Sequence, residues 1–324
     1  MSLLFAKSGI LTTVQDLGRG RYRRFGINPN GVMDRCGARL INILLGNDEN
    51  EAVVEMHFPA AQIVFESDAI FALGGADFGA ELDGEPVDNW RPNFAGKNST
   101  LKFTRKNSGH RAYLAVSGGF KLDQWLGSSS TNLTANIGGM DGRKLIAGDL
   151  LELRQPAMKP DRDVSRVQVS PSLLPYYSRF PTVRIIAGAE YELLSEVGRE
   201  LLTGQDLSIT NASDRMGFRL AGEPISLNEP LELLSSAVDF GTIQLLPDGQ
   251  LIVLMADHQT TGGYPRIAHV VSQDLPLMAQ LGPGDKVGFH LIEHGEAEQL
   301  ALDFERELRF FRVGCKFQAQ TWTN

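Results

Sequence analysis

The chain is short of cysteine, of basic charge and of long apolar runs, and each shortage excludes a class of protein. Two cysteines, Cys36 and Cys315, are too few for a disulfide framework, so we expect free thiols in a reducing cytoplasm. Thirty-one lysine and arginine residues against 39 aspartate and glutamate residues give a net charge of −8, which argues against nucleic-acid binding. No apolar run approaches the roughly 20 residues that span a bilayer. The opening Met1–Lys7 lacks the layout of a signal peptide.

Several motifs of nucleotide, nucleophile and metal sites are also missing. The sequence has no G-x-x-x-x-G-K-[ST] phosphate loop, no G-x-G-x-x-G after a strand and no G-x-S-x-G elbow. The letters of His290–His294 match H-x-x-E-H, but the alternation of Val287, Phe289 and Leu291 predicts a strand there. Two histidines four positions apart on a strand lie too far apart to share a zinc ion. We therefore expect no metal site, and any ATP chemistry must use residues outside these motifs.

Short β-branched and aromatic runs bounded by turn residues dominate the chain, which favours a mainly β fold. Examples in the first half are 61–65, 69–73, 99–103 and 111–116, and the 34 glycines suit many tight turns. A Gly-Asp turn precedes a strand-like run at both 148–149 and 284–285. This recurrence predicts two related barrels.

Three helices are expected. Asp34 is placed to cap Arg35–Leu45, and Gly46 is placed to end it. Asp274 is placed to cap Leu275–Leu281 in the same way. The third helix is Glu296–Phe311, with Leu300, Phe304, Leu308 and Phe311 on one stripe.

The length and one proline-rich stretch divide the chain. At roughly 150 residues per domain, 324 residues predict two domains. Residues 155–175 hold four prolines and little periodicity, as linkers do. We place an N-terminal domain at 1–155, a linker at 156–179, a C-terminal domain at 180–295, and a helix with tail at 296–324. Within the linker, Ala157-Met158-Lys159 has the letters of a biotinyl-lysine core, but Pro160 follows it, so we expect Lys159 to carry no biotin.

Three blocks combine glycine, hydroxyl, amide and charged residues in a way that a core does not require. They are Thr12–Arg19 with its extension Gly26–Asp34, Ser213–Leu220, and Gly241–Pro265. The T-T-V-Q-D and Q-T-T-G-G-Y-P strings within them resemble the family of the 5-oxoprolinase C-type subunit, also called urea amidolyase-related, KipA-like or allophanate hydrolase subunit 2. Further matching stretches are 45–48, 113–119, 126–131 and 138–143, so the likeness runs in family order over roughly residues 8–311.

The resemblance implies two cyclophilin-like β-barrels and a subunit of a complex that opens a cyclic amide with ATP. It implies a B-type (KipI-like) partner subunit and an A-type (LamB/YcsF-like) one. Carboxylase relatives use carboxybiotin, here not attached to this chain. We favour 5-oxoproline hydrolysis to glutamate because the chain stands alone, without fused biotin carboxylase or carrier domains. Two alternatives stay open: a non-catalytic regulator that antagonises a kinase-inhibitor paralogue, and a sugar- or peptide-binding barrel.

Chemistry at an amide carbonyl needs donors aimed at the emerging oxyanion and a base. For the base we single out Asp16, Asp214 and Asp257, provided that burial raises the pKa. Candidate substrate-binding groups are the guanidinium groups of Arg19 and Arg215, the amides of Gln15 and Gln244, the hydroxyls of Thr260, Thr261 and Tyr264, and the backbone of Gly262 and Gly263. On this hypothesis the fold brings Thr12–Arg19 and Gln259–Tyr264 together.

Each choice has a structural alternative. Asp16, Asp34 and Asp214 are also suited to capping, and Gly262-Gly263 to a tight turn. Arg215 is equally suited to a buried ion pair that holds the barrels together, and Tyr264 to a packing role.

Overall fold

The computed structural model describes residues 1–155, 167–229 and 231–319, and contacts divide the chain into two units. Unit 1 comprises Met1–Gly18, Asp34–Pro175 and Glu305–Asn324, and unit 2 comprises Arg19–Met33 and Tyr176–Phe304. Two segments thus fall outside the contiguous division expected from the sequence: 19–33 groups with the C-terminal part, and 305–324 with the N-terminal part. The string Ala157-Met158-Lys159 lies outside the described residues.

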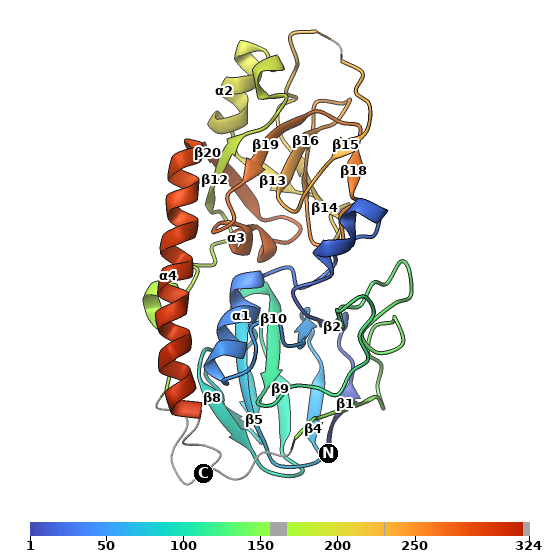
Figure 1. Cartoon of the computed structure of the whole chain (residues 1–324), viewed down its shortest axis with the longest axis vertical. Coiled ribbons are helices and arrows are strands. Elements are labelled where there is room, and N and C mark those ends of the chain that lie inside the picture. The colour runs from blue at the N-terminus through green and yellow to red at the C-terminus, as the bar shows by residue number, and fades with distance from the viewer. Residues whose placement is uncertain (156–166, 230, 320–324) are drawn as a thin grey trace. The chain divides into compact units, whose positions relative to one another are not determined.

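Unit 1 is built from two antiparallel sheets around one core (Figure 1). The first sheet has the order β11 (Leu150–Glu152), β1 (Ser2–Lys7), β4 (Gln62–Phe65), β9 (Thr100–Phe103), β6 (Ala80–Leu82) and β7 (Glu85–Pro86). The second has the order β2 (Thr12–Gln15), β3 (Val53–Met56), β10 (Ser108–Val116), β5 (Ala69–Asp77) and β8 (Pro92–Ala95). Alternate residues of both sheets fill the core, among them Leu3, Phe5, Phe71 and Leu114, because successive side chains of a strand point to opposite faces.

Helix α1 (Arg35–Leu44) packs against β5 and β10 of unit 1. The Asp34 carboxylate accepts a 2.8 Å hydrogen bond from the Gly37 N–H, and Gly46 has a φ of 73°. The predicted cap and the predicted glycine stop are therefore both confirmed. A 3-10 turn, η3 (Pro171–Leu173), also belongs to this unit.

Unit 2 is a closed seven-stranded barrel with a two-stranded extension (Figure 1). The barrel order is β12 (Thr182–Ala187), β19 (Arg266–Val270), β16 (Thr242–Leu245), β17 (Leu251–Leu254), β14 (Gly217–Ala221), β13 (Leu207–Ile209) and β20 (Lys286–Leu291). The strands β15 (Ser236–Ala237) and β18 (Thr261–Gly262) pair beside it. The unit also holds η1 (Gly20–Phe25), η4 (Tyr191–Leu193), α2 (Glu196–Gly204) and α3 (Leu275–Ala279).

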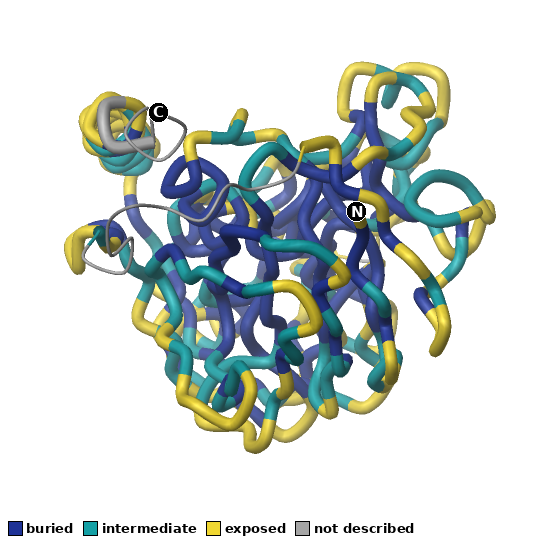
Figure 2. The backbone as a smooth tube through the Cα atoms, turned by 90° about the horizontal axis from the view of Figure 1, so that it is seen from below, coloured by how far each residue is buried: buried dark blue, intermediate teal, exposed yellow. Residues whose placement is uncertain are grey.

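Three neighbouring barrel strands show how the alternating pattern closes the core of unit 2. Ile243, Val253 and Phe218 face the interior, whereas Gln244 and Arg219 lie on the outer face. The mainly β fold is confirmed, with a closed barrel in one unit and two packed sheets in the other. Figure 2 shows how burial varies along the backbone: the strands are buried and the loops are mainly exposed.

Two helix predictions need correction. Asp274 makes no cap hydrogen bond to α3, because its carboxylate instead accepts three hydrogen bonds from Arg184, from the backbone N–H and two guanidinium nitrogens. The C-terminal helix α4 (His294–Ala319) begins at His294, which was expected in a strand. Its predicted stripe is confirmed in part: Leu308 is buried, and the other three residues are half-buried.

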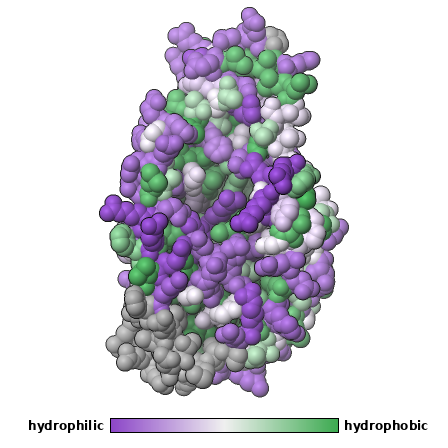
Figure 3. All heavy atoms as spheres, viewed as in Figure 1, coloured by the Kyte–Doolittle hydropathy of each residue, from purple (hydrophilic) through white to green (hydrophobic). Residues whose placement is uncertain are grey.

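The surface contains hydrophobic side chains outside the cores. Near the upper end of the face in Figure 3 they gather over the segment between β14 and β15, where Leu234 is 92% exposed. Among the described residues, no helix has the length and apolar character needed to cross a membrane.

Candidate functional site

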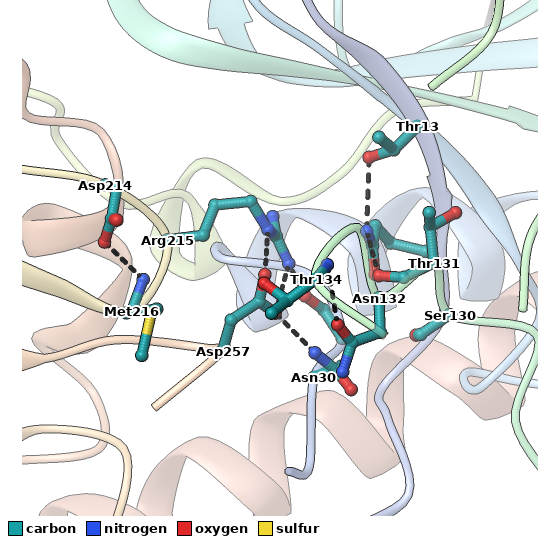
Figure 4. Close-up of polar contacts among 12 residues, drawn as sticks. Thr13, Asn30, Ser130, Thr131, Asn132, Thr134, Asp214, Arg215, Met216 and Asp257 are labelled. Carbon is teal, nitrogen blue, oxygen red and sulfur yellow. Dashed lines mark hydrogen bonds and ion pairs between the residues drawn. The ribbon is translucent and has the colours of Figure 1, made fainter. Parts of the chain in front are cut away.

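A charged network in unit 2 centres on Asp257, which follows β17. Its carboxylate accepts hydrogen bonds from Arg215 Nε at 2.9 Å, Arg215 Nη2 at 3.2 Å and Asn30 Nδ2 at 2.9 Å. Figure 4 shows these two side chains converging on the carboxylate. Arg215 Nη2 also donates to the Gly31 carbonyl at 2.5 Å. Because Asn30, Gly31, Arg215 and Asp257 all belong to unit 2, the ion pair fixes the 28–31 loop within that unit.

Two asparagines complete this network, and sequence reasoning gave them no role. Asn30 Oδ1 accepts a 2.6 Å hydrogen bond from Arg19 Nη1, and Asn28 Nδ2 donates to the carbonyls of Asp257 and His258. Asn30 has a φ of 55°, in the left-handed region that asparagine tolerates better than most residues. The N-P-N-G string of residues 28–31 is the turn signal that marks the loop.

In unit 1, Asp16 ties the end of β2 to the serine run 128–130. Its carboxylate accepts hydrogen bonds from the hydroxyls of Ser128 and Ser130, at 2.7 and 2.5 Å. The backbone N–H groups of Ser129 and Gly18 donate to it as well, at 2.6 and 2.7 Å. With four donors on a side chain that is 2% exposed, the structural alternative describes Asp16 better than a base does.

Gln15 precedes Asp16 in the chain and is also buried. Its Nε2 donates to Thr13 Oγ1 and to the Thr131 carbonyl, both at 3.2 Å. Its Oε1 is buried without a hydrogen-bond partner in the part of the chain that the structure describes.

A cavity of about 520 Å³ lies against the outer wall of the unit 2 barrel, and it gathers residues from the second and third blocks. Ile252, Leu254 and Gly217 from β17 and β14 contribute its apolar part, and Met216 and Leu246 add to it. Its polar lining residues are Asp214, Arg219, Gln244, Asp248, Gln259 and Tyr264. Its wall is polar and apolar in about equal parts, and a volume of this size lies within the range of small-molecule sites.

Asp214 closes the turn at the edge of this cavity. Its Oδ1 accepts from the N–H groups of Met216, at 2.7 Å, and Gly217, at 3.2 Å, and Figure 4 shows the shorter bond. Its Oδ2 makes no hydrogen bond within the described ranges. Of the three predicted bases, Asp214 thus has a turn role and retains an accepting oxygen.

The predicted oxyanion segment is a strand and not a tight turn. Thr261 and Gly262 form β18, and Gly263 also lacks a positive φ. A Cβ at Gly262 would lie 2.6 Å from Gln244 Nε2, so a larger residue here would displace the Gln244 amide. Thr260 is half-buried, whereas Thr261 and Tyr264 are exposed.

Among the residues of unit 2 with shifted pKa values are His269 and Glu190. Burial lowers the pKa of His269, which lies on β19 beside Thr242. The Arg266 guanidinium, which makes a bidentate pair with Glu190, lowers the pKa of that carboxyl. Both shifts favour the form that each side chain holds at neutral pH, so neither residue is prepared for proton transfer there.

The predicted site residues therefore divide between the units. Gln15 and Asp16 belong to unit 1, whereas the remaining ten predicted residues belong to unit 2. Within unit 2 the structure forms two groups: the Asp257 network with Arg19 and Arg215, and the cavity with Asp214, Gln244 and Tyr264. The meeting of Thr12–Arg19 with Gln259–Tyr264 stays a prediction.

Comparisons with known proteins agree along most of the chain. Residues 25–291 match the family model of the carboxyltransferase domain, subdomain A and B. The chain is 38% identical to the C-type subunit of 5-oxoprolinase from Haemophilus influenzae over 89% of this chain and 90% of that protein. It is 38% identical to the corresponding 5-oxoprolinase subunit from Escherichia coli, over 94% and 96%. The crystal structure of the K. lactis urea amidolyase superposes with a TM-score of 0.89 at 27% identity, over 96% of this chain. The chain spans a fifth of that protein.

Proposed function

Because the chain belongs to the family of the carboxyltransferase domain, subdomain A and B, we propose that it is the C-type subunit of an ATP-dependent 5-oxoprolinase complex. The complex converts 5-oxoproline to glutamate in the cytoplasm. One observation carries the proposal: the identity to two C-type subunits of 5-oxoprolinases extends along nearly the whole of both chains. The likeness to urea amidolyase is lower in identity and covers a fifth of that protein.

The reaction needs water to add to the lactam carbonyl and the ring C–N bond to break. The carbonyl oxygen becomes negative in the transition state, so donors preorganised near that oxygen speed the reaction. Unit 2 supplies such a group at its cavity: the exposed Tyr264 hydroxyl. Asp214, with one free carboxylate oxygen at the same cavity, is our candidate base.

The Asp257 network has a different part in this proposal. Its carboxylate is already held by three side-chain hydrogen bonds. Both carboxylate oxygens are therefore occupied, Oδ1 by Asn30 and Arg215 and Oδ2 by Arg215. We therefore assign Asp257 and Arg215 to holding the 28–31 loop against the barrel rather than to proton transfer.

The complex contains further subunits on this proposal: a B-type (KipI-like) subunit and an A-type (LamB/YcsF-like) one. The sequence has no phosphate loop, so we assign ATP binding to residues outside that motif, in this chain or in a partner. In a carboxyl-transfer branch of this proposal, carboxybiotin supplies the carboxyl group. In our proposal biotin is not attached to this chain.

The test is to purify the chain with its B-type and A-type subunits and to measure glutamate formed from 5-oxoproline and ATP. Activity is expected only with all three subunits and only with ATP. The Tyr264→Phe variant removes one hydroxyl near the carbonyl, and a loss of about 100-fold in kcat is expected from one such donor. Tyr176→Phe is the matched control, because Tyr176 is 86% exposed and lies outside the cavity.

Two outcomes would reject the proposal. An assembled, folded complex that forms no glutamate would favour the regulator, which pairs without turnover. Carboxylation of urea with ATP and bicarbonate, without action on 5-oxoproline, would instead assign the chain to the urea carboxylase branch.

A further inference from the structure

We propose that the cavity on the outer wall of the unit 2 barrel binds a small carboxylate that also carries an amide N–H, with Arg219 and Gln244 as its specificity-determining residues. Arg219 binds the carboxylate, and Gln244 Oε1 accepts the N–H. The inference deepens the proposed function and rests on it for the ligand, a lactam carboxylate. The binding chemistry follows from the cavity itself.

Gln244 is an amide held in one orientation with its oxygen unused. It lies on β16 between the inward-facing Ile243 and Leu245, so its side chain points to the outer face. Its Nε2 donates to the Tyr264 carbonyl at 3.2 Å. A flipped amide would set two oxygens against each other, so this contact fixes Oε1 as the free end.

The Gln244 Oε1 atom is also buried. Gln244 is 1% exposed, and its Oε1 is buried without a hydrogen-bond partner among the described residues. Gly262 packs so closely over the amide that a Cβ would come within 2.6 Å of Nε2. A buried acceptor without a donor is unfavourable, and the large majority of such groups in proteins are satisfied. Since Gln244 lines the cavity, a ligand N–H in that cavity supplies the donor.

Arg219 provides the cation on the same face of the sheet. Gln244 pairs with Ile252 across β16 and β17, and Ile252 pairs with Arg219 across β17 and β14. Two strand spacings put the Cα atoms of Gln244 and Arg219 about 10 Å apart. The Arg219 side chain is exposed and makes no ion pair within the described ranges. A guanidinium that is free of an internal partner is available for bidentate binding of a carboxylate.

The remaining lining limits the class of ligand. Ile252, Leu254 and Leu246 offer apolar contact to a small ring. Asp214 and Asp248 also line the cavity, so a second negative charge on the ligand is unfavourable there. A compact ring with one carboxylate and one N–H meets all of these conditions, and 5-oxoproline is such a molecule.

The experiment titrates the full chain, alone and assembled with its B-type and A-type subunits, by isothermal calorimetry. Three probes separate the contacts: 5-oxoproline, 2-pyrrolidone, which lacks the carboxylate, and 5-oxotetrahydrofuran-2-carboxylate, in which a ring oxygen replaces the N–H. We expect 5-oxoproline to bind, and each of the other two probes to bind at least about 10-fold more weakly.

Variants assign each contact to its residue. Gln244→Met is expected to lower the affinity for 5-oxoproline at least about 10-fold and to leave the affinity for the oxygen analogue unchanged. Gln273→Met is the matched control, because Gln273 also has a buried Oε1 without a hydrogen-bond partner among the described residues and lies outside the cavity. Arg219→Gln is expected to lower the affinity for both carboxylate probes. Its control is Arg306→Gln, because Arg306 is an exposed residue of α4.

Each result decides the question. Equal affinity for 5-oxoproline and its oxygen analogue, or equal effects of Gln244→Met and Gln273→Met, would overturn the assignment of Gln244. Absence of 5-oxoproline binding at about 10 mM to the assembled complex would overturn the site. Glutamate formation that persists in Arg219→Gln with unchanged KM would overturn the site while leaving the proposed function intact. Binding by these residues without glutamate formation would support the site and reject the proposed function.

Discussion

Removal of the Asp257 carboxylate tests whether the unit 2 network is structural. In Asp257→Ala, the Arg215 guanidinium loses two of its hydrogen bonds and Asn30 loses one, and the Gly31 carbonyl stays as an Arg215 partner. Loss of one member of a buried ion pair destabilises the folded state by about 3–5 kcal/mol. Because the Asp257 side chain keeps 16% exposure and that of Arg215 keeps 9%, we expect the low end, about 3 kcal/mol.

The assay must separate the two units, since they need not unfold together. Trp90 and Trp125 both lie in unit 1, so their fluorescence reports on that unit. Native-state hydrogen exchange, followed peptide by peptide, reports on the unit 2 strands as well. The opening free energy of β14 and β17 is expected to fall in Asp257→Ala, while the strands of unit 1 stay unchanged.

Two further variants control this prediction. Replacement of both partners, as Arg215→Met with Asp257→Leu, should recover much of the loss because no unpaired charge stays buried. Arg143→Met removes the Arg143–Asp149 pair of unit 1, where the arginine side chain is 37% exposed. It should change the free energy of unfolding of unit 1 by less than about 1 kcal/mol. The reasoning would be refuted by an Asp257→Ala protein whose β14 and β17 exchange as slowly as in the original.

Three other predictions concern single positions. Gly262→Ala should displace the Gln244 amide and break its bond to the Tyr264 carbonyl; a crystal structure of the variant with both groups unmoved would contradict this. Asp16→Ala leaves four donors without their acceptor and should destabilise unit 1 by about 2–4 kcal/mol, as read from tryptophan fluorescence in urea; a midpoint equal to that of the unaltered protein would contradict it. Burial lowers the pKa of His269, so the unfolded chain binds a proton more readily than the folded chain. The His269 contribution to stability is therefore complete above pH of about 6.5 and is lost as pH falls towards the lowered folded value. His269→Gln should flatten urea midpoints across this window, and an unchanged pH profile would contradict the prediction.

Local rules predicted those parts of the fold that depend on neighbours in sequence. Asp34 and Gly46 delimit α1 as expected because a cap needs only a side chain three residues from its partner. Gly148 and Gly284 both adopt positive φ before a strand. In each turn the aspartate that follows accepts an N–H from three residues earlier, at 2.8 and 3.1 Å. Asp274 failed as a cap because Arg184, ninety positions away, supplies stronger donors.

The candidate site was less predictable for the same reason. The sequence offered Arg215 either as an anion-binding group or as part of a buried ion pair, yet its partner Asp257 is set by a fold that joins positions 42 residues apart. Asn30 was overlooked because its partners, Arg19 and Asp257, come together only through the tertiary structure. Gln244 and Tyr264 were chosen as individual residues, and the barrel places both at one cavity.

The exchange of segments between the units constrains the order in which the ribosome delivers a foldable chain. Residues 19–33 are synthesised early, but the residues with which they pack, Tyr176–Phe304, are synthesised much later. Unit 1 in turn lacks its last helical segment until residues 305–319 have left the ribosomal exit tunnel. Domains usually fold one after another from the N-terminus during synthesis. Here neither half is complete before translation is nearly over, so a fragment cut near residue 155 would leave both halves unfinished.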